Sequence, residues 1–203
     1  METLIIYGCG GHARSVAASV MTDWNIIFID SAAKKNEKIF GFDVLTSLDG
    51  IHGIENCYFH IAVGDCSIRK NKFEEWKKCG FRFPVLLSKT AIICPEAVIG
   101  CGTFIAEGGY VGPYAVIGEN AIVNTHAVIE HDSSVQAHSH ISINSTVAGY
   151  THIGSSVFLG AGATVIDRLK ICNSVIVGAG AVVCNDIVTP GTYVGIPAKK
   201  IHE

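Results

Sequence analysis

Residues 115–144 read AVIGEN-AIVNTH-AVIEHD-SSVQAH-SHISIN, a run of hexapeptides with a small residue in first place and an aliphatic residue in third place. The aliphatic position recurs at every sixth residue from Ile93 to Val183 without a break. Such a period is typical of a parallel β-helix, in which each unit supplies one short strand and one turn. The aliphatic points inward, the small residue lets neighbouring walls approach, and a glycine that often follows the aliphatic tolerates the backbone of the turn. Three units close one triangular coil, so the repeat predicts a prism of about five coils.

The composition agrees with a β-helix and argues against several kinds of partner. Of the 203 residues, 49% are hydrophobic and 16% charged, and the formal net charge is −3. Without a Lys/Arg run, neither nucleic acid nor an anionic membrane is an expected partner. No apolar run is long enough to cross a bilayer, and the N-terminal residues do not resemble a signal peptide. The eight cysteines are scattered without a CxxC pair, as in a reduced cytoplasmic protein, so no disulfide or zinc framework is expected.

The first 88 residues follow a different pattern. We expect strands over Leu4–Tyr7, Ile26–Asp30, Asp43–Leu45, Tyr58–Val63 and Phe83–Leu87, and helices over Gly10–Met21 and Ser67–Cys79. This alternation predicts a small parallel sheet with crossover helices, a Rossmann-like α/β domain at residues 1–88. The hexads define a second domain at residues 89–203, which ends in a non-repeating tail from Pro190 to Glu203. No Ser/Gly-rich linker separates the two domains, so we expect them to pack tightly.

The segment Gly8-Cys9-Gly10-Gly11-His12-Ala13 lies between the first predicted strand and the first predicted helix. A glycine turn there lets the backbone approach a diphosphate, and the helix N-terminus offers unpaired N–H groups. Asp30, at the end of the second strand, can accept hydrogen bonds from a ribose or a base edge. The pattern resembles the dinucleotide fingerprint, although such a turn also serves as a plain tight connection. Fewer than about 90 residues cannot hold the second half of a dinucleotide site, so a nucleotide sugar fits better than NAD.

Histidines are concentrated in the hexads. A solenoid core has no use for imidazole, so we expect these rings at corners or on outer faces, with His138 and His152 in solvent. His131 differs because its two neighbours along the chain, Glu130 and Asp132, are carboxylates, and one of them can orient the ring and raise its basicity. Histidine titrates near neutral pH and can take a proton from an amine or hydroxyl nucleophile.

His140 lies half a coil beyond His131 and therefore faces another side of the prism. The two rings can meet only across a subunit boundary, which a cyclic trimer would provide. Acyl transfer from a thioester fits these residues, because an activated acyl group needs only a base, a backbone donor for the oxyanion and good positioning. No cysteine lies in a comparable constellation, and no metal is needed.

Several motifs resemble those of hexapeptide-repeat sugar acyltransferases. They are the strand–Gly-Gly-His turn, Asn124-Thr125, Val128-Ile129-Glu130-His131-Asp132, Ser139-His140 and Val194-Gly195-Ile196-Pro197-Ala198-Lys199. The chain is most similar to the PglD-type UDP-4-amino-sugar N-acetyltransferases of bacillosamine synthesis and their sialic-acid O-acetyltransferase relatives, over essentially its whole length. The resemblance implies a left-handed β-helix, although β-α-β crossovers are normally right-handed. It also implies acetylation of the amino group of a nucleotide-linked sugar, with a UDP-4-amino-4,6-dideoxy sugar as the expected substrate, in bacterial glycan biosynthesis.

The resemblance further implies a homotrimer with acetyl-CoA between adjacent prisms and the nucleotide sugar on the N-terminal domain. His131 corresponds to the general base, and Asp132 to the acid that raises its basicity. The implied contacts of acetyl-CoA are His140, the Gly149 N–H, and the backbone around Ala161 and Ala179. The implied contacts of the nucleotide sugar are Gly10, Gly11, His12, Asp30, Ser31, Gly64, Asp65 and Arg69.

Other functions stay open at this point. Within the family, the acceptor can be a sugar hydroxyl, as in the sialic-acid type, or the amino group of a GDP-linked sugar. A γ-class carbonic anhydrase uses the same prism, and His126 and His131 have the spacing of two of its zinc ligands. Thr90 stands near the place of the third ligand, however, and zinc needs three protein ligands there. A non-catalytic scaffold is the remaining alternative, although it needs neither the glycine turn nor the Glu-His-Asp sequence.

Overall fold

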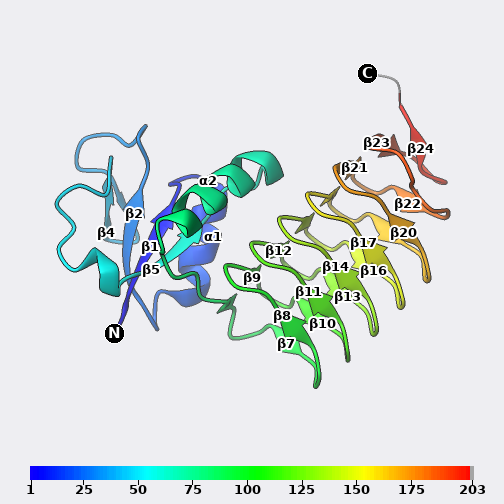
Figure 1. Ribbon diagram of the computed structural model, residues 1–203, viewed down its shortest axis with the longest axis horizontal. Helices are drawn as coiled ribbons and strands as arrows, with labels where there is room; N and C mark the ends of the chain where they lie inside the picture. The colour runs from blue at the N-terminus through cyan, green and yellow to red at the C-terminus, as the bar shows by residue number, and fades with distance from the viewer. Residues whose placement is uncertain (202–203) are drawn as a thin grey trace.

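The computed structural model describes residues 1–201, which form an α/β sheet domain and a long prism of stacked coils (Figure 1). The sheet has the strand order β3-β4-β2-β1-β5. Its strands are β1 (Thr3–Tyr7), β2 (Asn25–Ile29), β3 (Lys38–Ile39), β4 (Phe42–Leu45) and β5 (Tyr58–Ile61). β1 pairs in parallel with β2 and β5, and β2 with β4, whereas the short β3 is antiparallel to β4. The predicted parallel sheet is confirmed, with helices α1 (Gly11–Val20) and α2 (Cys66–Lys78) and the 3-10 turn η1 (Ile54–Asn56).

Helix α1 joins the sheet to the prism through one shared core. Its buried apolar residues Ala13, Val16, Ala17 and Val20 have the spacing of a single helix face. That face packs in one buried cluster with Leu4 and Phe28 of the sheet and with Phe104 and Ile122 of the prism. The tight packing expected from the missing linker is therefore present.

Helix α2 is capped at its N-terminus and packed along one face. Asp65 caps its N-terminus, because Asp65 Oδ1 accepts a hydrogen bond of 2.8 Å from the Ile68 N–H. Phe73 and Trp76 are buried, and the Trp76 ring lies edge-on to Phe59 of β5. Neither α-helix in the described part of the chain is long and apolar enough to cross a membrane.

The prism is a left-handed parallel β-helix with three flat faces. The first face comprises β6 (Leu86–Leu87), β9 (Phe104–Ile105), β12 (Ile122–Val123), β15 (His140–Ile141), β18 (Phe158–Leu159), β21 (Val175–Val177), β23 (Gly191–Val194) and β24 (Lys199–Lys200). The second face comprises β7 (Ile92–Ile93), β10 (Tyr110–Val111), β13 (Val128–Ile129), β16 (Thr146–Val147), β19 (Thr164–Val165) and β22 (Val182–Val183). The third face comprises β8 (Val98–Ile99), β11 (Val116–Ile117), β14 (Ser134–Val135), β17 (His152–Ile153) and β20 (Lys170–Ile171).

The register confirms that three hexads make one coil. Val123 pairs with Ile105 and with Ile141, the equivalent residues one coil before and one coil after it. Every repeat aliphatic from Ile105 to Val183 is at most 3% exposed, so these side chains form one continuous core. We name the corners of the prism by the faces that meet there: the first–second, second–third and third–first edges.

The glycines that follow the repeat aliphatics allow close contact between neighbouring coils. We expected them instead to adopt the backbone conformation of the turn. A Cβ on Gly118 would lie 2.5 Å from the Ala137 backbone N of the next coil, and one on Gly100 would lie 2.5 Å from the Glu119 N. The left-handed backbone of the turn occurs two residues later, as at Asn120, where φ is 52°. At these two positions a side chain would meet the backbone of the next coil.

Three further expectations are corrected. The strand predicted over Phe83–Leu87 shortens to β6 and pairs with β9 of the prism, not with the N-terminal sheet. The predicted tail after Pro190 continues the coil, because β23 pairs in parallel with β21 before β24 folds back on it; its last two residues lie outside the described range. His138, expected in solvent, is only 4% exposed because helix α2 covers the corner that carries it, and its ring packs edge-on against Phe73.

Candidate active site

His131 lies on the second–third edge, in the corner between β13 and β14. Its Nδ1 is 2.8 Å from Asp132 Oδ2, so Nδ1–H donates to the carboxylate and leaves the Nε2 lone pair free. Asp132 reaches back to the ring from a left-handed backbone with φ of 57°, a conformation that aspartate tolerates. Glu130, the other neighbouring acid, accepts a hydrogen bond from the His131 backbone N–H instead. The side chain of His131 is 48% exposed, so a substrate can reach Nε2.

Gly149 leaves the space in front of this ring open. A Cβ at Gly149 would lie 2.8 Å from His131 Nε2. Tyr150 packs edge-on against the His131 ring, and the Tyr150 N–H donates to the His131 carbonyl at 3.1 Å. Among residues 1–201 the Gly149 N–H has no acceptor, so it is available to a ligand beside Nε2.

His140 lies elsewhere, in β15 on the first face, beneath the N-terminal domain. Its Nδ1–H donates to the Gly64 carbonyl at 3.1 Å, and its Nε2 accepts from Asn124 Nδ2 at 3.1 Å. Burial lowers the pKa of His140 to about 4, despite the opposing effect of the Gly64 carbonyl. The ring is therefore neutral at pH 7 and connects the loop before α2 to the prism. In the triangular cross-section, His131 lies on the edge opposite this face, so one chain does not bring the two histidines together.

The glycine turn leaves open space at the N-terminus of α1. No atom lies within 4 Å of a Cβ built on Gly10 or Gly11, and the N-terminus of α1 has no side-chain cap. Asp30 secures the turn from β2, because its carboxylate accepts from the Cys9 N–H at 3.1 Å and the Ala32 N–H at 2.9 Å. Partial burial raises the pKa of Asp30, but these hydrogen bonds outweigh that effect and the net shift is downward. Ser31 follows in an exposed position.

His12 contributes its backbone to this turn, whereas its ring points toward the prism. The ring lies 5.8 Å from Phe104 and 6.2 Å from His140, centroid to centroid. Its Nε2 is buried without a hydrogen-bond partner in the described part of the chain. Burial lowers the pKa of His12 to about 3, so this ring is also neutral.

Arg69 does not fit the predicted direct contact with a nucleotide sugar. Its side chain is 1% exposed, and its guanidinium donates to backbone carbonyls on both sides of the domain junction. The acceptors are the carbonyls of Val63, Gly64, Asn120, His138 and Ser139. Arg69 therefore holds the Gly64–Asp65 loop against the prism from the buried side of the loop.

A cavity of about 690 Å³ lies between the first turn of α2 and the first face. Gly64, Asp65 and His140, all predicted site residues, line it. The other residues that line the cavity were not predicted: Cys66, Ser67, Lys70 and Asn71 from α2, and Ser156, Phe158, Ser174 and Ile176 from the prism. Ser67, Lys70 and Asn71 are three and four residues apart and so share one helix face. This spacing was the sequence signal that could have indicated the α2 side of the cavity.

The remaining predicted residues lie on other edges. Ala161 and Ala179 occupy exposed corners one coil apart on the first–second edge. His126 lies on that same edge, whereas His131 lies on the second–third edge. The two histidines of the carbonic anhydrase alternative therefore do not converge within one chain.

Comparison with known proteins agrees with this geometry. Residues 3–76 match the family model of the PglD N-terminal domain. The acetyltransferase domain of PglB from Neisseria gonorrhoeae FA1090 has 32% identity and a TM-score of 0.91, over 99% of this chain and 100% of that chain. Its structure in complex with acetyl coenzyme A gives 33% identity and a TM-score of 0.91, over 98% and 99%.

A third similar structure is a histidine-to-alanine mutant of GDP-perosamine N-acetyl transferase from Caulobacter crescentus, in complex with CoA and GDP-perosamine. It has 27% identity and a TM-score of 0.92, over 100% of this chain and 98% of that chain. Comparison with curated protein sequences gives no match. Fold and comparisons together define a β-helix acyltransferase with a PglD-type N-terminal domain. The chain belongs to the PglD family of acetyl-CoA-dependent sugar N-acetyltransferases, which confirms the predicted resemblance.

Proposed function

We propose that this enzyme acetylates the amino group of a UDP-linked 4-amino-4,6-dideoxy sugar, with His131 as general base. The observation that carries the proposal is the His131–Asp132 pair, in which the carboxylate holds Nδ1–H and leaves a half-exposed Nε2 as proton acceptor. An imidazole held in this tautomer can accept a proton from a substrate amine.

The step needs no covalent enzyme intermediate. Nε2 accepts a proton from the sugar amine as the nitrogen attacks the thioester carbonyl carbon. The Gly149 N–H donates to the oxygen of the tetrahedral intermediate, which lowers the barrier. The C–S bond then breaks, the thiolate of CoA takes the proton from the imidazolium, and the amide and free CoA leave.

The nucleotide sugar lies on the N-terminal domain in this proposal. Gly10 and Gly11 leave open space at the uncapped N-terminus of α1, where backbone N–H groups suit a diphosphate. Asp30 and Ser31 then lie beside the nucleoside. The similarity to a GDP-perosamine enzyme makes a GDP-linked amino sugar the second candidate.

The catalytic unit in this proposal is a homotrimer. His131 and the cavity beside His140 lie on opposite sides of one prism, so the base of one subunit serves the nucleotide sugar of its neighbour. Large exposed side chains on and beside the second–third edge support an interface there: Tyr114 is 62% exposed, Val116 45% and Tyr150 46%. Acetyl-CoA would lie along this interface, between Gly149 of one subunit and neighbouring coils that include Ala161 and Ala179.

The test is turnover of defined substrates by wild-type and variant enzyme. With acetyl-CoA and the UDP-linked amino sugar, the wild type should release CoA and yield a sugar heavier by one acetyl group. His131→Asn should lower kcat by about 10²–10⁴-fold while the acetyl-CoA Kd changes little. His152→Asn, the same change at an exposed ring of the third face, serves as control. Wild-type kcat in His131→Asn at neutral pH would exclude the proposed base, and preferential turnover of the GDP-linked sugar would select the second candidate.

A further inference from the structure

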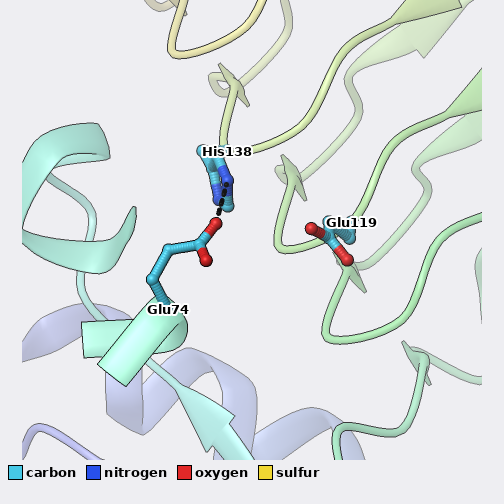
Figure 2. A group of neighbouring side chains, drawn as sticks. All are labelled: Glu74, Glu119 and His138. Carbon is cyan, nitrogen blue, oxygen red and sulfur yellow. Dashed lines mark ion pairs between the residues drawn. The ribbon is translucent and has the colours of Figure 1, made fainter. Parts of the chain in front are cut away.

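A group of metal-binding side chains lies away from His131, where α2 crosses the third–first edge. Figure 2 shows Glu74 reaching from α2 toward His138, with Glu119 on the neighbouring coil. One ligand atom from each residue can be chosen so that all three lie within 4.8 Å of one another. His138 Nε2 and Glu74 Oε1 are 3.5 Å apart. One imidazole and two carboxylates thus converge from segments far apart in the sequence.

Charged side chains of both signs surround this group. Lys77 pairs with Glu119 at 2.5 Å. The ion-pair partner of Glu74 is His138, which carries charge only when protonated. Two carboxylates therefore share the space beside a buried ring, with Lys77 paired to Glu119 and with Lys70 and Arg69 also near the ring.

A buried amide behind the ring points to a ligand at its front. Asn120 is 1% exposed, and its Nδ2 is 2.9 Å from His138 Nδ1. Its Oδ1 is buried and has no hydrogen-bond partner in the described residues. Turning the amide over would let Oδ1 accept from Nδ1–H, which is the arrangement that metal-bound histidines use to direct Nε2 toward the ion.

We propose that Glu74, Glu119 and His138 bind a divalent cation of the zinc class, with water in the remaining coordination position. A mixed nitrogen and oxygen ligand set suits zinc and disfavours magnesium, which prefers oxygen ligands alone. Glu74 belongs to α2 and the other two ligands to the prism, so the ion would clamp the helix to the coils. The same helix begins at the Gly64–Asp65 loop, and the clamp would therefore stabilise the junction beside His140.

The experiment is a zinc titration of the untagged full-length enzyme after chelator treatment and desalting. Calorimetry should show one zinc site per chain, and bound zinc should raise the melting temperature. Glu74→Gln should weaken the affinity at least tenfold. It alters a side chain that is 42% exposed, so the fold should survive. Glu75→Gln, the neighbouring residue that pairs with Lys72, is the matched control and should bind zinc as the wild type does.

Two further variants test whether His138, and not another histidine, binds the zinc. His131→Asn should keep the zinc affinity, because His131 lies on another edge. Asn120→Asp should bind zinc at least as tightly as the wild type, since a carboxylate accepts Nδ1–H even better than an amide. Absence of zinc binding to the wild type, equal affinity in Glu74→Gln, or loss of the site in His131→Asn would each overturn the proposal.

Discussion

Because Gly149 has no side chain, Nε2 of His131, the candidate general base, is open to a ligand. The Gly149 Cα is so close to the imidazole that a Cβ there would lie 2.8 Å from His131 Nε2. Gly149→Ala should therefore displace the ring or close its front, and a displacement of about 1 Å costs on the order of 10²-fold in kcat. Steady-state kinetics and a melting curve of the variant would check this. Unchanged kcat in a folded Gly149→Ala enzyme would contradict the position given to Nε2.

The sequence could predict some residues of the site and not others. His131 and Asp132 are adjacent in the chain and share one corner, so their contact depends on local geometry that a hexad pattern implies. Arg69 and His138 gave no such signal. Their burial depends on how α2 lies across the prism, and spacing along the chain does not report which face another domain covers.

At the scale of elements, β15 meets the loop before α2 and helix α1 through neutral histidines, His140 and His12. Burial lowers the pKa of His140 to about 4 and that of His12 to about 3, from an ordinary value of 6.5. The unfolded chain therefore binds more protons than the folded chain between pH 6.5 and about 4. Stability should be full above pH 6.5 and fall as the pH decreases through this window, by about 3 kcal/mol from His140 alone.

Urea denaturation at several pH values from 7 to 4.5 measures this dependence. His140→Gln should lower the stability at pH 7, because Gly64 and Asn124 lose their partner, and should also make the pH dependence shallower. The second effect distinguishes protonation from simple loss of packing. An equal slope in the two proteins would contradict a neutral, buried His140.

The elements themselves differed in how well they could be predicted. The hexads specify every coil, because an inward aliphatic must recur whenever the chain returns to a face. Leu87 of β6 precedes Ile93 by six residues, so the hexad register reaches back to β6 and indicates its pairing with β9. The prediction missed this because Leu87 directly follows the apolar run that begins at Phe83. The coiled structure also continues beyond the last hexad. Ile187 forms a β-bridge with Ile171, although it follows Val183 by four residues and is therefore outside the six-residue register.

At the scale of the whole molecule, the proposed site is divided between two sides of one chain. His131 occupies the edge opposite the first face, whereas the glycine turn packs near that face through α1. Sequence spacing predicted different sides for His131 and His140, but only the fold shows that the second of them lies beneath the N-terminal domain. A trimer would give each His131 a neighbouring glycine turn, and light scattering should report three chains per particle.

Subunit complementation tests this division most directly. His131→Ala should lack the base, and Gly10→Phe should lack nucleotide-sugar binding because its side chain fills the space for the diphosphate. The two variants, each almost inactive, would be unfolded together, refolded as mixed trimers and assayed. If each site joins His131 of one subunit to Gly10 of its neighbour, about one quarter of the sites in random trimers combine two intact halves. The account predicts recovery of about a quarter of wild-type activity; mixed trimers no more active than the parent variants would contradict it.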